Sequence, residues 1–172
     1  MTTQIHEFTY QPTEGSILGL YPNGYGFGYA YLDEKGEPQA HMRSVRNKKD
    51  DSLFTKMKQE LVAYQPDILV LKEPKEYGRR SSKRITEAIQ HIKEFAQECN
   101  VTVHQYTRDQ VEGAFYNFGV RTKFERAQLM AQNFFSLEGI APQYRKAWMP
   151  ESFTMGAFDA LGLILTHLYL SE

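Results

Sequence analysis

Basic residues gather in one short segment of the chain, between residues 75 and 84. Five of its ten positions are basic and one is acidic, the basic residues being Lys75, Arg79, Arg80, Lys83 and Arg84. Ser81 and Ser82 are good caps for the helical pattern that follows, and the free N–H groups at the start of a helix favour phosphate. The segment therefore predicts a nucleic-acid-binding surface, with a solvated charged loop as the alternative reading.

A row of aromatic residues alternates along a predicted strand, so its members share one face. The row consists of Tyr25, Phe27, Tyr29 and Tyr31. Such rings can stack on nucleobases, but a row of this kind is more typical of a core or of a partner surface. Glycines at 24, 26 and 28 resemble a phosphate loop, but a strand rather than a helix follows them, which excludes the dinucleotide motif.

Several function classes are excluded by composition. The single cysteine, Cys99, rules out an internal disulfide framework and a cysteine-rich zinc site, and we interpret it as a buried thiol. The longest apolar run, 160–165, is far too short to span a membrane, and the N-terminus carries no signal-peptide pattern. We therefore expect a cytoplasmic protein without a membrane partner.

The 172 residues, 41% of them hydrophobic and 24% charged, fit one globular domain. We expect a flexible lead-in over residues 1–15 and a single domain over residues 16–172. The formal net charge of −1 argues neither for nor against a nucleic-acid partner, so only local clustering of charge is informative.

Hydrophobic periodicity predicts an alternation of strands and helices around these residues. The expected strands are 16–21, 26–32, 39–45, 68–71 and 101–106, and the expected helices are 53–64, 85–96, 107–115, 122–135 and 154–170, with an irregular connection over 136–150. Turns at 22–24 and 33–38 imply that the first three strands form an antiparallel meander. The fully apolar strand 68–71 is typical of a central parallel strand. The result is an α/β fold: a three-stranded meander continued by two parallel strands, with helices on both faces of the mixed sheet.

This order is that of the ribonuclease H-like fold, and four motifs resemble the RuvC-type Holliday-junction resolvases of that superfamily. In the family the first strand reads Ile-Leu-Gly-Ile-Asp-Pro-Gly with a later Gly-Tyr, and the fourth strand begins Pro-Asp and ends in Glu. A Thr-Pro-x-x-Val-Lys segment follows the fifth strand. The last helix reads Asp-Ala-Ala-Asp-Ala-Leu and closes on Thr-His. The corresponding segments here are 17–23 with 28–29, 66–72, 106–112 with Gly119 and Lys123, and 156–161 with 166–167.

The resemblance implies a two-metal nuclease, in which carboxylates from the first strand, the fourth strand and two positions of the last helix converge on the ions. Here those positions are Tyr21, Lys72, Gly156 and Asp159, so one acid of four remains. We therefore expect a degenerate metal site in which Lys72 and Asp159 form a structural ion pair. Glu73, next to Lys72, is the nearest replacement acid, although neighbouring strand residues point to opposite faces.

The resemblance favours a non-catalytic role in binding or scaffolding branched DNA, as a homodimer and without a cofactor. The nucleic-acid-binding residues are then Arg79, Arg80, Lys83, Arg84 and Lys123, the last matching a basic family position. One alternative is an active, divergent crossover-junction endodeoxyribonuclease, with Asp159 and Glu73 catalytic and Asp159 holding Mg²⁺. Another is a protein-interaction subunit that partners an active nuclease.

Overall fold

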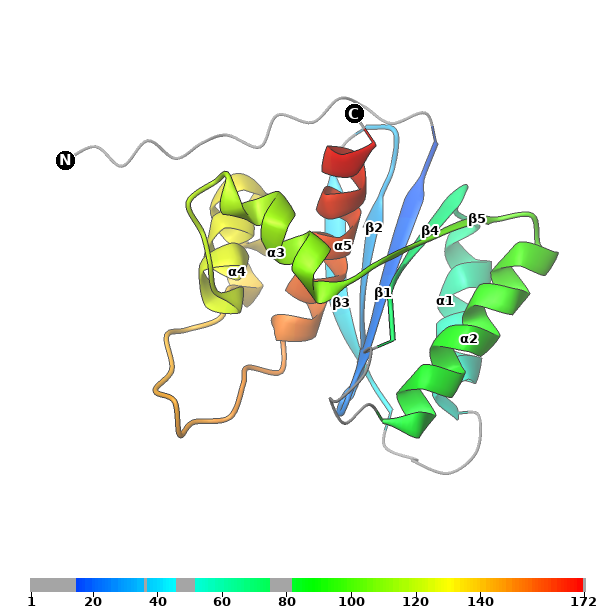
Figure 1. Ribbon diagram of the computed structural model, residues 1–172, viewed down its shortest axis with the longest axis horizontal. Helices are drawn as coiled ribbons and strands as arrows, with labels where there is room; N and C mark the ends of the chain where they lie inside the picture. The colour runs from blue at the N-terminus through cyan, green and yellow to red at the C-terminus, as the bar shows by residue number, and fades with distance from the viewer. Residues whose placement is uncertain (1–14, 36, 46–51, 75–81, 172) are drawn as a thin grey trace.

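A five-stranded mixed sheet runs through the centre of the computed structural model, which describes residues 15–35, 37–45, 52–74 and 82–171 (Figure 1). The strand order is β3-β2-β1-β4-β5. The strands are β1 (Ile17–Asn23), β2 (Gly26–Leu32), β3 (Pro38–Ser44), β4 (Ile68–Lys72) and β5 (Thr102–Tyr106). The first three form an antiparallel meander, and β4 and β5 continue it in parallel with β1, which confirms the predicted sheet.

Helices cover both faces of this sheet, as predicted (Figure 1). They are α1 (Ser52–Tyr64), α2 (Lys83–Glu98), α3 (Arg108–Tyr116), α4 (Lys123–Asn133), the short 3-10 helix η1 (Phe135–Ile140) and α5 (Met155–Leu170). Helices α1 and α2 lie on one face, and α3, α4 and α5 lie on the other. The helix η1 occupies the start of the segment that we expected to be irregular. Within the described part of the chain, none of the helices is long and apolar enough to cross a bilayer.

The first strand is longer than predicted, because it continues through Pro22 to Asn23. Up to Leu20, β1 pairs with β4 on one side and with β2 on the other; beyond Leu20 it pairs with β2 alone. Proline lacks an N–H group and is tolerated where a strand has a neighbour on one side only. The ends of β1 and β4 therefore separate at Tyr21.

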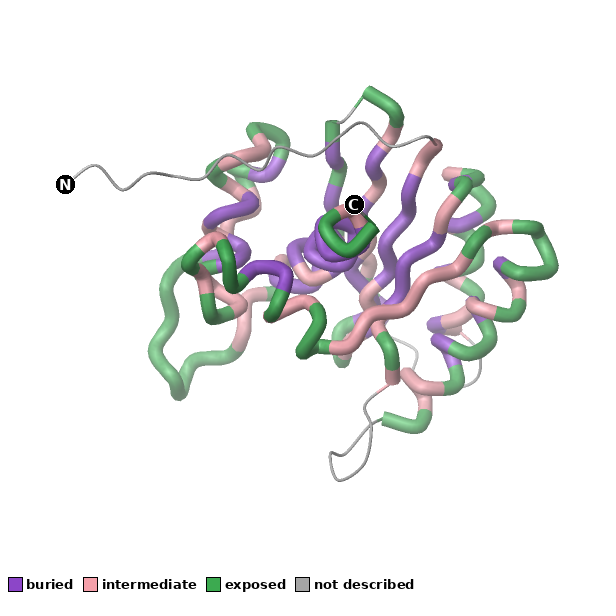
Figure 2. The backbone as a smooth tube through the Cα atoms, turned by 45° about the horizontal axis from the view of Figure 1, so that its top comes forward, coloured by how far each residue is buried: buried purple, intermediate pink, exposed green. Residues whose placement is uncertain are grey.

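Side chains of β1 alternate between the two faces of the sheet and pack into two hydrophobic cores, one on each face. Leu18 and Leu20 pack with α1 and α2, whereas Ile17 packs with α5, on the face toward which Tyr21 also points. Helix α5 is buried along nearly its whole length (Figure 2), as its unbroken apolar sequence predicts. The aromatic row belongs largely to the other core, between the sheet and α1 and α2, because Phe27 is fully buried there and the rings of Tyr29 and Tyr31 contact Tyr64 of α1.

The structure corrects the prediction for Cys99 and does not describe most of the predicted lead-in. Cys99 is exposed rather than buried, because it lies in the turn just after α2, as the C-cap of that helix, and not on the buried side of the helix. Residues 1–14, most of the expected lead-in, lie outside the described residues, and the division of the chain into lead-in and domain stays a prediction.

Close approach of α5 to the sheet depends on three glycines. A Cβ atom at Gly19 would lie 2.6 Å from the carbonyl oxygen of Ala160, and one at Gly28 would overlap the carbonyl of Gly156. A Cβ atom at Gly156 would in turn lie 2.5 Å from Sδ of Met42 and 2.7 Å from Nδ2 of Asn23. The position of the missing helical acid is therefore closely packed, and a side chain there would have to displace the flexible ends of Met42 and Asn23.

Gly28→Ala is expected to lower the free energy of unfolding by roughly 3 kcal/mol, because the added methyl group meets backbone rather than a side chain that can turn away. Gly24→Ala, four residues earlier in the same hairpin, is the matched control, since a Cβ atom there has no neighbour within 4 Å among the described residues. Urea unfolding of both variants measures the difference. Equal stabilities for the two variants would contradict the close packing of α5 on β2.

Candidate functional site

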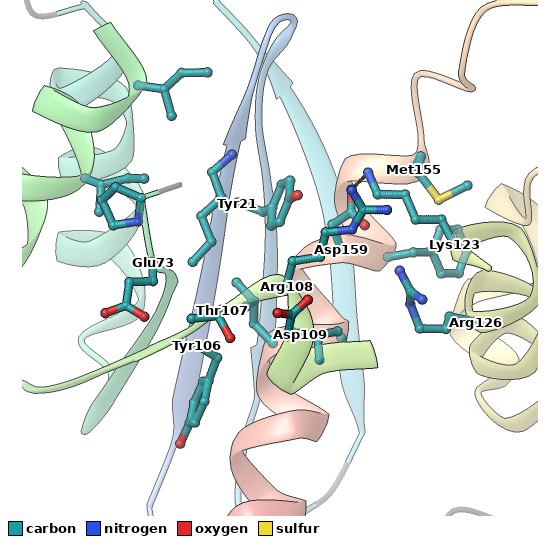
Figure 3. A pocket seen from close by; sticks show the side chains of 18 of the residues that line it. Tyr21, Glu73, Tyr106, Thr107, Arg108, Asp109, Lys123, Arg126, Met155 and Asp159 are labelled. Carbon is teal, nitrogen blue, oxygen red and sulfur yellow. Dashed lines mark hydrogen bonds and ion pairs between the residues drawn. The ribbon is translucent and has the colours of Figure 1, made fainter. Parts of the chain in front are cut away.

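A cavity of about 620 Å³ opens where the carboxyl ends of β1, β4 and β5 meet the helices (Figure 3). Tyr21, Lys72 and Tyr106 line it from these strands, and Asp159 lines it from α5. Crevices outside the carboxyl ends of strands are the usual ligand sites of open α/β sheets. Three of the four positions that correspond to family acids thus lie in one cavity, as the resemblance predicts.

Four helices begin at this cavity. Ser82 and Thr107, the N-caps of α2 and α3, line it together with Lys123 and Met155, the first residues of α4 and α5. Each helix start carries a partial positive charge, about half an elementary charge when unscreened. The first turns of α2 and α5 contain no acidic residue that would offset it. The backbone around the cavity therefore favours an anion over a cation.

A pair of charge interactions in the cavity joins α4 to α5 and to the segment before α5. Nζ of Lys123 lies 3.3 Å from Oδ2 of Asp159 and 3.3 Å from Oε1 of Glu151, which precedes α5. The side chain of Asp159 is only 12% exposed. Burial raises the pKa of Asp159, an effect that Lys123 opposes. Burial acts to lower the pKa of Lys123, but Asp159, Tyr21 and Glu151 together raise it above its usual value, so this ammonium group stays charged.

The predicted ion pair between Lys72 and Asp159 is wrong, because Asp159 pairs with Lys123. Nζ of Lys72 instead lies 4.4 Å from the ring centre of Tyr21, and Nζ of Lys123 lies 5.7 Å from the same ring. A cation held over an aromatic face is stabilised by the ring quadrupole. Burial, together with Asp159, raises the pKa of Tyr21, so its hydroxyl group remains protonated at neutral pH. Two ammonium groups thus surround the residue at the position of the first-strand acid.

The residues of the cavity do not fit a two-metal centre. Glu73 is exposed and lies on the β4 side, across the cavity from Asp159 (Figure 3). Its backbone N–H donates to the carbonyl oxygen of Tyr106, so the backbone of Glu73 continues the pairing of β4 with β5 and does not turn toward α5. The carboxylates of Asp159 and Glu151 are both bonded to an ammonium group. Among the described residues, no three His, Cys, Asp or Glu side chains are placed to share a metal ion.

The predicted nucleic-acid-binding residues fall into three groups. Arg79 and Arg80 lie outside the described residues. Lys83 projects into solvent from the first turn of α2, 3.8 Å from Glu87. In Arg84, Nε and Nη2 are shielded from solvent and donate to no group within the described part of the chain. Lys123 belongs to the ion pair described above.

Sequence reasoning missed two arginines of the cavity. Arg126, on the buried side of α4, has its pKa lowered by burial, an effect that Asp159 opposes. Arg108 begins α3 and is paired with Glu112 at 2.8 Å. Glu112 stands at the lysine of the family's Thr-Pro-x-x-Val-Lys segment, and its spacing of four residues from Arg108 was the signal for this pair. With these residues the cavity contains four cationic and four anionic side chains, listed as Lys72, Arg108, Lys123, Arg126, Glu73, Asp109, Glu151 and Asp159.

Solved structures with this arrangement of strands and helices include Thermus thermophilus RuvC, with a TM-score of 0.63 and 18% identity over 91% of this chain and 95% of that chain. The chain has the fold of the Holliday junction resolvases. The same RuvC in complex with Holliday junction substrate gives a TM-score of 0.64. The fowlpox virus resolvase gives 0.55 at 14% identity, covering 91% of this chain and 99% of that one. The yeast mitochondrial resolvase Ydc2 gives 0.55 at 9% identity, covering 96% and 81%.

The likeness lies in the fold rather than in the sequence. No protein-family model matches the sequence, and no curated protein matches it. The predicted ribonuclease H-like architecture is confirmed by the shared resolvase fold. The chain therefore keeps the fold even though Tyr21, Lys72 and Gly156 replace acidic residues of the family.

Lys123→Met is expected to lower the free energy of unfolding at pH 7 by about 2 kcal/mol, because two carboxylates lose their shared cation. Asp159→Asn should have a smaller effect, since Lys123 keeps Glu151. The deficit of Lys123→Met should shrink as the pH falls, because the raised pKa of Asp159 lets that carboxyl group take up a proton and lose its charge. Urea unfolding at pH 7 and pH 4.5 measures both effects.

Lys83→Met provides the control, since Lys83 makes only an exposed pair that contributes little to stability. If Lys123→Met and Lys83→Met were equally stable at pH 7, the pairing of Lys123 with Asp159 and Glu151 would be refuted.

Proposed function

We propose that the chain binds branched DNA and does not cut it by the two-metal route of nucleases with this fold. One observation carries the proposal: in a resolvase fold, the ammonium group of Lys123 lies between the carboxylates of Asp159 and Glu151. An ammonium group in that position competes directly with a divalent cation for the same oxygens. Binding can outlast the loss of metal ligands, because it depends on phosphate contacts rather than on the ions.

The charges at the start of α2, beside a cavity whose own lining has four cationic and four anionic side chains, support an anionic ligand. Helix α2 begins at the cavity with Lys83 and Arg84 in its first turn and no acidic residue there. The shielded Nε and Nη2 of Arg84 have no acceptor in the described part of the chain, and buried donors without an acceptor are unfavourable. If the Arg84 side chain turns outward on binding, a phosphate oxygen would satisfy them in the paired geometry that guanidinium groups adopt with phosphate. The preference for a branched rather than a linear duplex comes from the fold, since two of the similar structures hold Holliday junctions.

An active nuclease is the weaker reading, since it would require Glu73 and Asp159 to leave their present positions on opposite sides of the cavity. The homodimer, the cytoplasmic location and the absence of a required cofactor stay predictions.

A four-way junction and a linear duplex of equal length, each with a fluorescent label, test the proposal by anisotropy and by denaturing gels. The junction should bind more tightly than the duplex, with affinities in EDTA and in Mg²⁺ that agree within about threefold after matching ionic strength. Both DNAs should remain uncut in Mg²⁺ and in Mn²⁺. Affinity should fall with salt, and a Lys83→Ala/Arg84→Ala variant should show a shallower salt dependence, by about one phosphate contact for each residue lost.

Lys58→Ala is the matched control for loss of a cation, because Lys58 lies over the ring of Phe95, on the other face of the sheet. It should bind the junction as the unaltered protein does. Metal-dependent cleavage that is abolished by Asp159→Asn would overturn the proposal, and so would equal affinity for junction and duplex.

A further inference from the structure

The segment that leads from η1 to α5, residues 141–150, carries exposed rings and cations in alternation. We call it the arm. Its sequence contains Tyr144, Arg145, Lys146 and Trp148 and no acidic residue. Tyr144 and Trp148 are each 78% exposed. Figure 2 shows the connection between α4 and α5 as an exposed loop that stands away from the buried core.

The arm is nevertheless fixed at several points. Nε2 of Gln128 donates to the carbonyl oxygen of Pro142, and the ring of Tyr144 meets Phe124 edge-on at 5.9 Å. The N–H of Met149 donates to the carbonyl oxygen of Lys146 at 3.0 Å, which closes a turn. Trp148 is the third residue of that turn. A turn of this kind holds its central side chains outward, so Trp148 is presented to solvent by hydrogen-bonded backbone.

These anchors also place the arm beside the cavity. Pro142 contacts Gln128 in the middle of α4, and Tyr144 contacts Phe124, which is next to the first residue of that helix, Lys123. The residue directly after the arm is Glu151, which pairs with Lys123 at the cavity. In Figure 1 the arm, in orange, runs from the α4 side of the molecule to the start of α5. The arm therefore leads directly into the site at which the proposed function places DNA, because Glu151, the residue after it, lines the cavity.

We propose that the arm binds unpaired nucleotides at the branch of the DNA, with Trp148 stacked on a base and with Arg145 and Lys146 on neighbouring phosphates. The inference rests on the proposed function and adds a ligand preference to it. Rings that alternate with cations are typical of surfaces that bind single strands without reading sequence, because every base has a face on which a ring can stack.

A protein partner fits the arm less well. The cores of protein interfaces are depleted in charged side chains, whereas here two cations separate the two most exposed rings of the arm. The local positive charge is complementary to phosphate, and no acidic residue within the arm offsets it.

Trp148 is the only tryptophan of the chain, so its fluorescence reports on the arm alone. The probes are a fully paired four-way junction, the same junction with two unpaired thymines at its centre, and a linear duplex. The emission of Trp148 should be quenched by the junction with unpaired thymines and much less by the duplex. Trp148→Ala should weaken binding of that junction by about tenfold, the loss expected for one stacked base, while Trp148→Phe should retain most of the affinity.

Phe135→Ala is the matched control for loss of an exposed ring. Phe135 is 90% exposed, and its neighbour Ser136 donates to the carbonyl oxygen of Pro38, at the end of the sheet opposite Tyr21. It should bind all three DNAs as the unaltered protein does.

The two proposals fail in different ways. Junction binding by anisotropy without a change in Trp148 emission, and with full affinity in Trp148→Ala, would overturn the role of the arm and leave the proposed function in place. Failure to bind any of the DNAs would overturn both. Self-association that Trp148→Ala abolishes, with DNA affinity unchanged, would assign the arm to a protein interface and would also overturn the inference.

Discussion

The ammonium group of Lys123, shared by Asp159 and Glu151, is the interaction on which the arrangement of the site depends. It ties the first residue of α4 to the first turns of α5 and to the segment before α5. Because Asp159 is nearly buried, its negative charge is unfavourable there without a nearby cation. The cation is supplied by the chain itself, so Asp159 and Glu151 are already paired. We therefore expect the affinity of the cavity for divalent metal ions to be low.

The packing of α5 against the sheet also disfavours a metal site. Contact between Gly28 and the backbone at Gly156 brings the helix close to β2, and an acidic side chain at residue 156 would have to displace the ends of Met42 and Asn23. A reversion to a metal site would need new acids at residues 21, 72 and 156 and a rearrangement of these two side chains.

The architecture could be predicted from the sequence because its signals are local and strong. The apolar run 68–71 and the capped, amphipathic pattern of α2 each determine an element without reference to the rest of the chain. The extension of β1 through Pro22 could not be predicted, since it depends on β4 ending at Lys72 beside it. The site was predicted in part: Tyr21, Lys72 and Asp159 do share one cavity. The partner of Asp159 was wrong, because the choice between Lys72 and Lys123 depends on how α4 docks against α5, and that docking leaves no periodic signal in the sequence.

Calorimetric titration of the protein with Mg²⁺ and Mn²⁺ tests most directly the claim that an internal ammonium group has replaced the metal ions. We predict no saturable binding at millimolar metal concentrations, because Asp159 and Glu151 already share the ammonium group of Lys123. Saturable binding of two ions, lost in Asp159→Asn, would contradict it and would mean that the acids of this chain assemble around metal after all.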